Sequence, residues 1–158
     1  MSQSAVASIA SLWSDLQMRT YEVTEEDRNL IKEAYAALEK ARVPGNFFHT
    51  VGCCLKAKDG TLYHGVNCDC IHGSCAEFVA VGNAVSNGCH DFDTIVSVHP
   101  DGPSGLFAPC GNCRQMLMEY SPSIKVILAD ENGKIIKTDI AELLPLAWTR
   151  LPTGDLLH

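Results

Sequence analysis

The amino-acid sequence predicts an α/β protein with the architecture of a three-layer α/β/α sandwich, in which a β-sheet lies between layers of helices. Strand-like and helix-like segments alternate along the chain, which is the order expected when helices cover both faces of a sheet. The chain has 158 residues, of which 46% are apolar and 20% charged, and a chain of this size can bury one hydrophobic core. We therefore expect one folded domain, residues 24–158, preceded by an N-terminal extension, residues 1–23.

The first helix of the domain is predicted to begin after Thr24. A threonine is a good helix N-cap, and the three acidic residues that follow it suit the positive end of a helix. Apolar side chains then recur every three or four positions from Leu30 to Ala41, as on the buried face of an amphipathic helix. Pro44 and Gly45 end this pattern.

The rest of the domain is predicted to contain a β-hairpin and then alternating helices and strands. The hairpin strands are residues 50–56 and 61–66, and Gly60 between them can adopt the positive φ that a tight turn needs. The later segments are apolar patterns bounded by Gly, Pro and Asn turn signals. They are helices at residues 75–85, 111–120 and 140–144, and strands at residues 92–98, 124–129 and 134–138.

The acidic balance of the chain argues against several classes of partner. The net charge is −7 and the sequence pI is about 5.2, and no cluster of Lys and Arg offers a footprint for a nucleic-acid backbone. No apolar run approaches the length of about 20 residues that a membrane span needs. The start, Met1–Ser4, lacks the basic region of a secretory signal peptide, so we expect a cytoplasmic protein. In a reducing compartment the eight cysteines are expected to be thiols or metal ligands.

Two short motifs predict a metal site. They are Cys-Ala-Glu at residues 75–77 and Pro-Cys-Gly-Asn-Cys at residues 109–113, and each falls at the predicted start of a helix. Cys110 and Cys113 can bring two thiolates within reach of one tetrahedral Zn²⁺, and Cys75 is the candidate for the third ligand. Three protein ligands leave one position open for water, as in catalytic zinc sites. Helix N-termini also lower thiol pKa values, so we expect all three thiols to be close to the ligating form.

The glutamate of the first motif is the candidate catalytic group. Glu77 lies two residues after Cys75 and could hold a metal-bound water and move its proton. Taken alone, a Cys-x-x-Cys pair is typical of a redox pair or of half a structural zinc site. In this order, however, the two motifs match the zinc-deaminase signature, His or Cys-x-Glu followed by Pro-Cys-x-x-Cys. Three thiolates leave the zinc centre with a net negative charge, which we expect Arg114 and the two helix N-termini to offset.

Short segments on either side of the two motifs extend the match to a family: Val51-Gly52, Asp59-Gly60, Gly65-Val66-Asn67 and Leu143-Leu144-Pro145. Together with the motifs, they make residues 51–148 resemble the cytidine deaminase superfamily, in its small zinc-dependent branch. The resemblance implies a five-stranded mixed sheet flanked by helices, a homotetramer and a small-molecule cytosine nucleoside as substrate. It also implies zinc held by the three motif cysteines, with the motif glutamate as proton shuttle.

The resemblance further implies which residues contact the substrate. Asn67 matches the asparagine that contacts the sugar, and Asp69 stands in the place of a glutamate and is a candidate for binding a sugar hydroxyl. His49 lies where the family often stacks a phenylalanine on the pyrimidine, and Trp148 where an aromatic residue reaches the site of a neighbouring subunit. The remaining expected contacts come from the two motifs and are Ala76 and Pro109.

Where this chain departs from the nucleoside deaminases, its sequence resembles that of the blasticidin-S deaminases, another group of the superfamily. Nucleoside deaminases usually follow Cys-Ala-Glu with Arg, whereas this chain has Phe78, and its segment from Asn67 to Ser74 is shorter than theirs. Both features look like the blasticidin-S deaminases, which remove the amine from the cytosine of a nucleoside-like antibiotic. Asn112 departs from that group, which has Arg between the two cysteines.

The expected function is therefore zinc-dependent hydrolytic deamination of the cytosine ring of a nucleoside antibiotic, blasticidin S, which would confer antibiotic resistance. The alternative is a cytidine or deoxycytidine deaminase of pyrimidine salvage. A rival of another class is a catalytically inactive, zinc-stabilised binding module. Outside the metal pattern, Cys53 and Cys54 lie in an apolar strand and are predicted to be small core residues.

Overall fold

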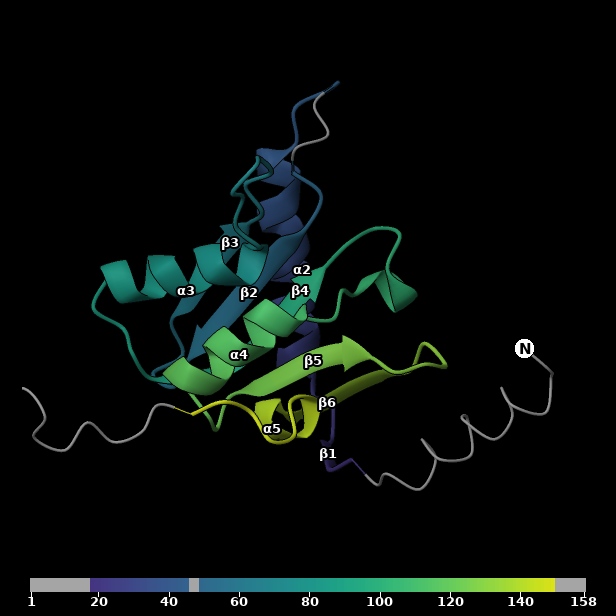
Figure 1. Ribbon diagram of the computed structural model, residues 1–158. Coiled ribbons are helices and arrows are strands. Elements are labelled where there is room, and N and C mark those ends of the chain that lie inside the picture. The colour runs from purple at the N-terminus through teal and green to yellow at the C-terminus, as the bar shows by residue number, and fades with distance from the viewer. Residues whose placement is uncertain (1–17, 46–48, 150–158) are drawn as a thin grey trace, which may run out of the picture.

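The computed structural model describes residues 18–45 and 49–149, and it confirms the three-layer α/β/α architecture (Figure 1). Within these residues the mixed sheet has six strands: β1 (Thr20–Tyr21), β2 (Gly52–Ala57), β3 (Leu62–Val66), β4 (Phe92–Val98), β5 (Lys125–Ala129) and β6 (Ile135–Asp139). They lie side by side in the order β1-β6-β5-β4-β2-β3. β4 and β5 are parallel, and all other neighbours are antiparallel.

The sixth strand, β1, corrects the expectation of a five-stranded sheet. Its two residues pair antiparallel with β6, and the Tyr21 hydroxyl donates a hydrogen bond to the carboxylate of Asp139 at 2.7 Å. A strand of two residues is too short to show the alternating pattern by which strands are recognised in a sequence. The last part of the expected extension, residues 1–23, therefore contributes to the sheet, while residues 1–17 lie outside the described residues.

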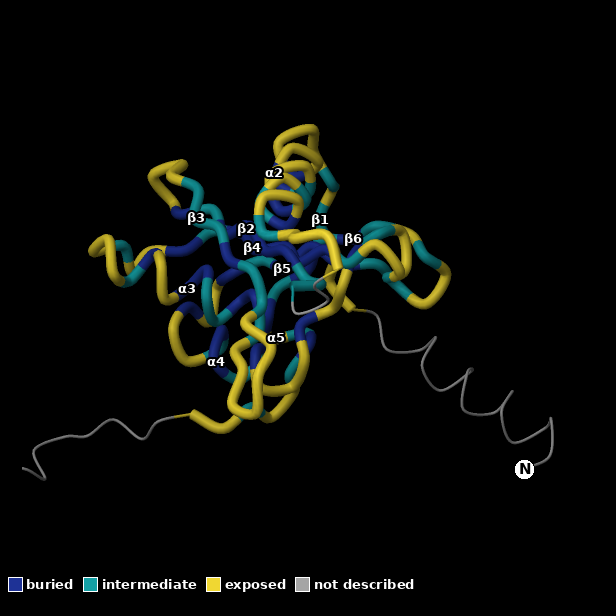
Figure 2. Tube along the Cα trace, turned by 90° about the horizontal axis from the view of Figure 1, so that it is seen from above, coloured by how far each residue is buried: buried dark blue, intermediate teal, exposed yellow. Residues whose placement is uncertain are grey.

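Helices cover both faces of the sheet. In the part of the chain that the structure describes they are α2 (Glu25–Ala41), α3 (Ala76–Ser86), α4 (Gly111–Tyr120) and α5 (Ile140–Leu143), with a 3₁₀ turn at Pro103–Gly105. α2 packs on one face, and α3, α4 and α5 pack on the other, as two perpendicular views show (Figures 1 and 2). No helix among the described residues is both long enough and apolar enough to cross a membrane.

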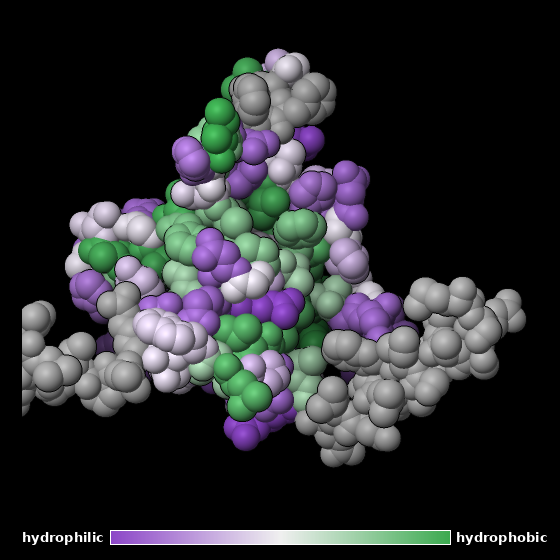
Figure 3. All heavy atoms as spheres, viewed as in Figure 1, coloured by the Kyte–Doolittle hydropathy of each residue, from purple (hydrophilic) through white to green (hydrophobic). Residues whose placement is uncertain are grey.

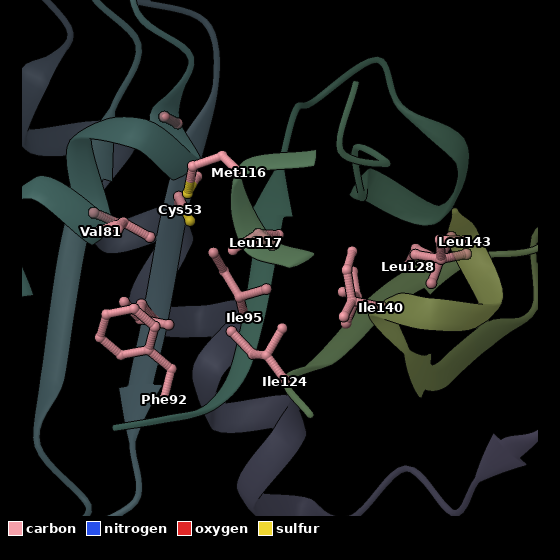
Figure 4. Close-up of a cluster of buried hydrophobic side chains, with 14 of the residues drawn as sticks. Cys53, Val81, Phe92, Ile95, Met116, Leu117, Ile124, Leu128, Ile140 and Leu143 are labelled. Atoms are coloured by element: carbon pink, nitrogen blue, oxygen red, sulfur yellow. The ribbon is translucent and has the colours of Figure 1, made fainter. Parts of the chain in front are cut away.

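Two hydrophobic clusters fill the spaces between the layers. The larger cluster, between the sheet and α3–α5, includes Phe92, Ile95 and Leu117 (Figure 4). The smaller cluster lies between the sheet and α2. Cys53 and Cys54 are fully buried, and because successive strand residues face opposite sides of a sheet, the first belongs to the larger cluster and the second to the smaller. Their predicted role as core residues is confirmed.

A buried ion pair ties α2 to β6. The hydroxyl of Thr24 accepts a hydrogen bond from the N–H of Asp27, and the Asp27 carboxylate accepts one from the N–H of Thr24. The same carboxylate accepts a hydrogen bond from Lys137 Nζ at 2.7 Å, and both side chains are largely buried. Burial raises the pKa of Asp27, but Lys137 and the hydrogen bonds from Thr24 outweigh it, so the pKa lies below its usual value.

Asp27→Ala is expected to lower the free energy of unfolding by about 3 kcal/mol at pH 7, because it leaves the buried Lys137 ammonium unpaired and removes the capping box. Since the folded-state pKa is lowered, this stabilisation is present above the unfolded-state pKa and is lost as the pH falls through the folded-state pKa. Urea denaturation at neutral and at strongly acidic pH measures both effects. Glu25→Ala, which breaks an exposed ion pair on the same helix, is the control and should cost less than about 0.5 kcal/mol. Equal losses in the two variants would contradict the prediction.

Candidate active site

Two helix N-termini bring three cysteines together on the α3–α4 side of the sheet. Cys75 is the N-cap residue of α3, Cys110 is the N-cap residue of α4, and Cys113 lies in the first turn of α4. The Sγ atoms of Cys75 and Cys110 are 3.8 Å apart, and those of Cys110 and Cys113 are 3.6 Å apart. All three sulfurs lie within 4.8 Å of one another, so the two motifs converge on one point.

This donor set fits one tetrahedral zinc ion. Zn–S bonds of about 2.3 Å at tetrahedral angles place two sulfurs about 3.8 Å apart, close to the spacing of this group. The same spacing is much longer than a disulfide bond of about 2.05 Å. Among residues 18–45 and 49–149, no other group of three Cys, His, Asp or Glu side chains is so arranged. Three thiol ligands leave a fourth position open, which is the arrangement of a catalytic site.

Burial works against the ionisation of two of the three thiols. It raises the pKa of Cys113 well above its usual value, and the nearby Glu77 carboxylate raises it further. Burial likewise raises the pKa of Cys75. Burial also opposes ionisation of Cys110, but hydrogen bonds from Cys113 and from the N–H of Asn112 outweigh it and lower that pKa. The expected lowering of all three thiol pKa values by helix N-termini therefore holds for Cys110 alone, and a bound cation is what would ionise the other two.

Glu77 lies beside the cysteines, in the first turn of α3, and is only 4% exposed. It lines a cleft of about 310 Å³ together with Cys75 and Cys110. Gly65 of β3 permits this arrangement, because a Cβ atom at that position would collide with the backbone of Ala76 at the start of α3. The close contact between β3 and α3 thus positions both the first cysteine and the glutamate.

The same cleft collects several residues that the sequence predicts as substrate contacts. Asn67, Asp69 and Ala76 all line it. The side-chain oxygen of Asn67 accepts hydrogen bonds from the N–H groups of Thr50 and Val51, each at 2.9 Å, which fixes the orientation of its amide. Among the described residues that line the cleft, none is Lys, Arg or His, so its charged groups are carboxylates.

Three other predicted contacts are not among the described residues that line this cleft. His49 lines two neighbouring clefts, and its Nδ1 lies 2.8 Å from the carbonyl oxygen of Asn67. Pro109 is buried in the second motif. Trp148 is 62% exposed, and its carbonyl oxygen accepts a hydrogen bond from Gln115 of α4. Within one chain, His49 therefore contacts the site through its hydrogen-bond contact with Asn67 and does not line the cleft. Trp148 lies outside the cleft.

Arg114 contacts backbone carbonyl groups on both sides of the second motif. Its Nε donates a hydrogen bond to the carbonyl oxygen of Pro109 at 2.9 Å, and its Nη1 donates one to that of Leu143 at 3.0 Å. The guanidinium thereby joins the segment just before Cys110 to the end of α5. The expected role of Arg114 in offsetting thiolate charge stays a prediction. Its observed hydrogen bonds hold the segment before Cys110 in place.

One aromatic side chain of the cleft is not predicted by the sequence patterns. Phe107 lines the cleft and lies three residues before Cys110. The preceding residues, 99–106, show only the Pro and Gly content of a loop, and a single aromatic residue after a loop has no pattern that marks a binding role. Nearness to the second motif is the one signal that could have identified it.

This chain is similar in sequence and in fold to known proteins. The family model described as "Cytidine and deoxycytidylate deaminase zinc-binding region" matches residues 24–129. A blasticidin-S deaminase of Bacillus cereus is 37% identical over 142 residues, which cover 84% of this chain and 99% of that protein. A cytidine deaminase of Sporosarcina psychrophila is 40% identical over 126 residues, which cover 77% of this chain and 90% of that protein. The crystal structure of a cytidine deaminase from Burkholderia pseudomallei superimposes with a TM-score of 0.64 at 35% identity, covering 77% of this chain and 98% of that one.

The region matched by the family model contains both motifs, and in the structure their three cysteines form a group that could hold a metal ion. Zinc is the metal that the family model names, and it is also the metal that the sulfur donor set fits. The chain therefore belongs to the cytidine and deoxycytidylate deaminase family, and it is a zinc-dependent aminohydrolase.

Proposed function

We propose that this enzyme hydrolyses the amine from the cytosine ring of a nucleoside antibiotic, blasticidin S, and so confers resistance to it. The charge of the cleft carries this proposal. Among the described lining residues, the carboxylates of Asp69 and Glu77 are the charged side chains, and no basic side chain is present. Such a cleft disfavours the phosphate of a nucleotide and suits blasticidin S, whose tail carries a guanidinium.

Two further observations support the antibiotic as substrate. Phe78, at the position where nucleoside deaminases carry Arg, packs against the larger hydrophobic cluster. The segment that follows Asn67 closes as a short turn, in which Cys68 and Ser74 exchange two backbone hydrogen bonds of 3.0 and 3.1 Å. The similarity to the Bacillus cereus blasticidin-S deaminase, over almost the whole length of that protein, is consistent with both features.

Deamination of cytidine or deoxycytidine is the second candidate function. The relative from Sporosarcina psychrophila, a cytidine deaminase, has the higher identity, although over a smaller share of this chain. Asn112, which stands where blasticidin-S deaminases have Arg, also favours this candidate. Both candidates share one chemistry and differ only in what is attached to the cytosine ring.

The residues of the cleft can be assigned separate tasks in that chemistry. Zinc, when bound by the three thiolates, lowers the pKa of a water molecule and so supplies a nucleophile at neutral pH. We expect the Glu77 carboxylate to take the proton from the attacking water and pass it to the departing amine, as a carbon–oxygen bond forms and the carbon–nitrogen bond breaks to release ammonia. Because Glu77 is buried, bulk water has little access to that proton. We assign Asn67 and Asp69, which line the same cleft, to binding hydroxyl or amine groups of the attached sugar.

We also propose that the enzyme works as a cytoplasmic homotetramer. Leu146 and Trp148 are large apolar side chains that stand exposed on the single chain. Hydrophobic residues also gather in the middle of the face that α3 and α4 present to the viewer in Figure 3. Contact between copies would remove such side chains from water, and it is the arrangement in which Trp148 could reach a neighbouring site.

A substrate panel tests the proposed function. Zinc-loaded enzyme is mixed separately with blasticidin S, cytidine and cytidine 5′-monophosphate, and loss of the cytosine amine is followed by ultraviolet absorbance and ammonia release. We expect kcat/KM for blasticidin S to exceed that for cytidine by about tenfold or more, with the nucleotide the poorest substrate. Turnover of cytidine without turnover of blasticidin S would overturn the antibiotic as substrate and leave the second candidate.

A further inference from the structure

Two aromatic rings stand next to each other at the border of the cleft. The ring centroids of His99 and Phe107 are 5.3 Å apart, with an angle of 32° between their planes. Phe107 lines the cleft together with Cys110, whereas His99 is not among the described lining residues and lines the neighbouring cleft. The phenyl ring therefore has the imidazole on one side and remains 46% exposed.

The backbone holds this pair in a fixed position. The N–H of Phe107 donates a hydrogen bond to the carbonyl oxygen of Ser97 at 2.9 Å, and the preceding residue, Leu106, is buried and pairs with the last residue of β4. The Nδ1 of His99 accepts a hydrogen bond from the N–H of Asp101 at 3.0 Å, which fixes the plane of the imidazole. A side chain whose backbone is already held in place loses less conformational entropy when a ligand packs on it.

We propose that Phe107 is a substrate-binding residue that stacks on the pyrimidine ring of the substrate, with His99 as its support. This inference rests on the proposed function, because it requires a cytosine ring in the cleft. Three residues span at most about 10 Å, so the phenyl ring lies within reach of a ring that reacts beside Cys110 and Glu77. Aromatic side chains are the surfaces on which nucleobases stack, whatever their sequence or sugar. His49, which the resemblance places in the stacking role, lines neighbouring clefts instead.

Substitutions of Phe107 test the proposal through the separate values of KM and kcat. Stacking stabilises the bound substrate and the transition state alike, so its loss should raise KM and leave kcat nearly unchanged. With cytidine and with blasticidin S, we expect Phe107→Ala to raise KM by about tenfold and to change kcat by less than about twofold. Phe107→Trp should stay within about threefold of the parent, whereas Phe107→Leu, which keeps apolar bulk without a ring face, should resemble the alanine variant. Tyr120→Ala removes another half-exposed aromatic side chain, outside the cleft, and is the control with unchanged KM.

A binding measurement keeps this test independent of turnover. In the Glu77→Gln background, isothermal titration with cytidine should give a dissociation constant that Phe107→Ala raises by about tenfold, at unchanged zinc content. A change below about twofold in both KM and the dissociation constant, or full retention of affinity by Phe107→Leu, would overturn the proposal. If the parent enzyme deaminates no cytosine compound, the proposed function fails. The dissociation constants measured with and without Phe107→Ala then still test whether Phe107 stacks on the cytosine ring. If the Glu77→Gln protein binds neither cytidine nor blasticidin S, the stacking proposal is overturned as well.

Discussion

Glu77→Gln is expected to lower kcat for deamination by about 10³-fold while zinc stays bound at one ion per chain. The amide has nearly the shape of the carboxylate, but it cannot accept the proton of the attacking water or return it to the leaving amine. Glu77 is buried in the cleft beside two of the three cysteines, and among the described residues that line this cleft the only other carboxylate is that of Asp69. Steady-state kinetics, together with metal analysis of the same samples, measures both quantities.

Asp69→Asn is the matched control for this variant, because it neutralises the second carboxylate of the same cleft. Its effect is expected mainly on KM, with kcat within about tenfold of the parent, since Asp69 is assigned to binding and not to proton transfer. If Glu77→Gln retained most of the parental kcat, the proton-shuttle role would be wrong. If the two substitutions lowered kcat equally, the loss would reflect the charge of the cleft and not the chemistry of one residue.

Cys113→Ser is expected to abolish tight zinc binding and deamination together, and to lower Tm by about 10 °C. Cys113 is fully buried, and its sulfur lies 3.6 Å from that of Cys110. A metal that binds only the folded chain stabilises it by about 4 kcal/mol when present at a thousand times its dissociation constant, and loss of that term accounts for the shift in Tm. Metal analysis after dialysis against zinc-free buffer and a thermal melt provide the measurements.

Cys89→Ser is the control for the loss of a thiol as such. Cys89 is partly exposed, and its Sγ lies 3.9 Å from the carbonyl oxygen of Asp91, away from the metal group. It should retain the zinc content, the Tm and the activity of the parent. Stoichiometric zinc in dialysed Cys113→Ser protein would show that the ion is held elsewhere.

Local signals explain which parts of the fold could be predicted from the sequence. The strand at residues 92–98 and the helix at residues 111–120 have the predicted bounds, because turn residues and apolar patterns mark their ends in the chain itself. β1 could not be predicted, since its two residues are ordered by pairing with β6, more than 100 positions away in the sequence. Such pairing leaves no pattern in a segment of this length.

The candidate site also has features that local sequence motifs predict and features that depend on tertiary packing. The sequence motifs select Cys75, Cys110 and Cys113, and the structure brings these three sulfurs together. Their acidity could not be predicted from the motifs, because the burial that raises two of the three thiol pKa values depends on how α3 and α4 pack on the sheet. The position of Phe107 is likewise a tertiary property: hydrogen bonding to the end of β4 directs this residue to the cleft, and no local pattern records it.

The most direct test of the central claim, that this chain is a zinc-dependent aminohydrolase of a cytosine nucleoside, is a zinc titration of enzyme stripped by a chelator. Ammonia release from blasticidin S and from cytidine is measured at each zinc-to-protein ratio. We predict no activity in the stripped protein, a linear rise with added zinc and saturation at one ion per chain, with one ammonia released per ring converted. Full activity in the stripped protein would contradict the zinc-dependent mechanism. A zinc-saturated protein that releases no ammonia from either substrate would favour a binding module over an enzyme of this specificity.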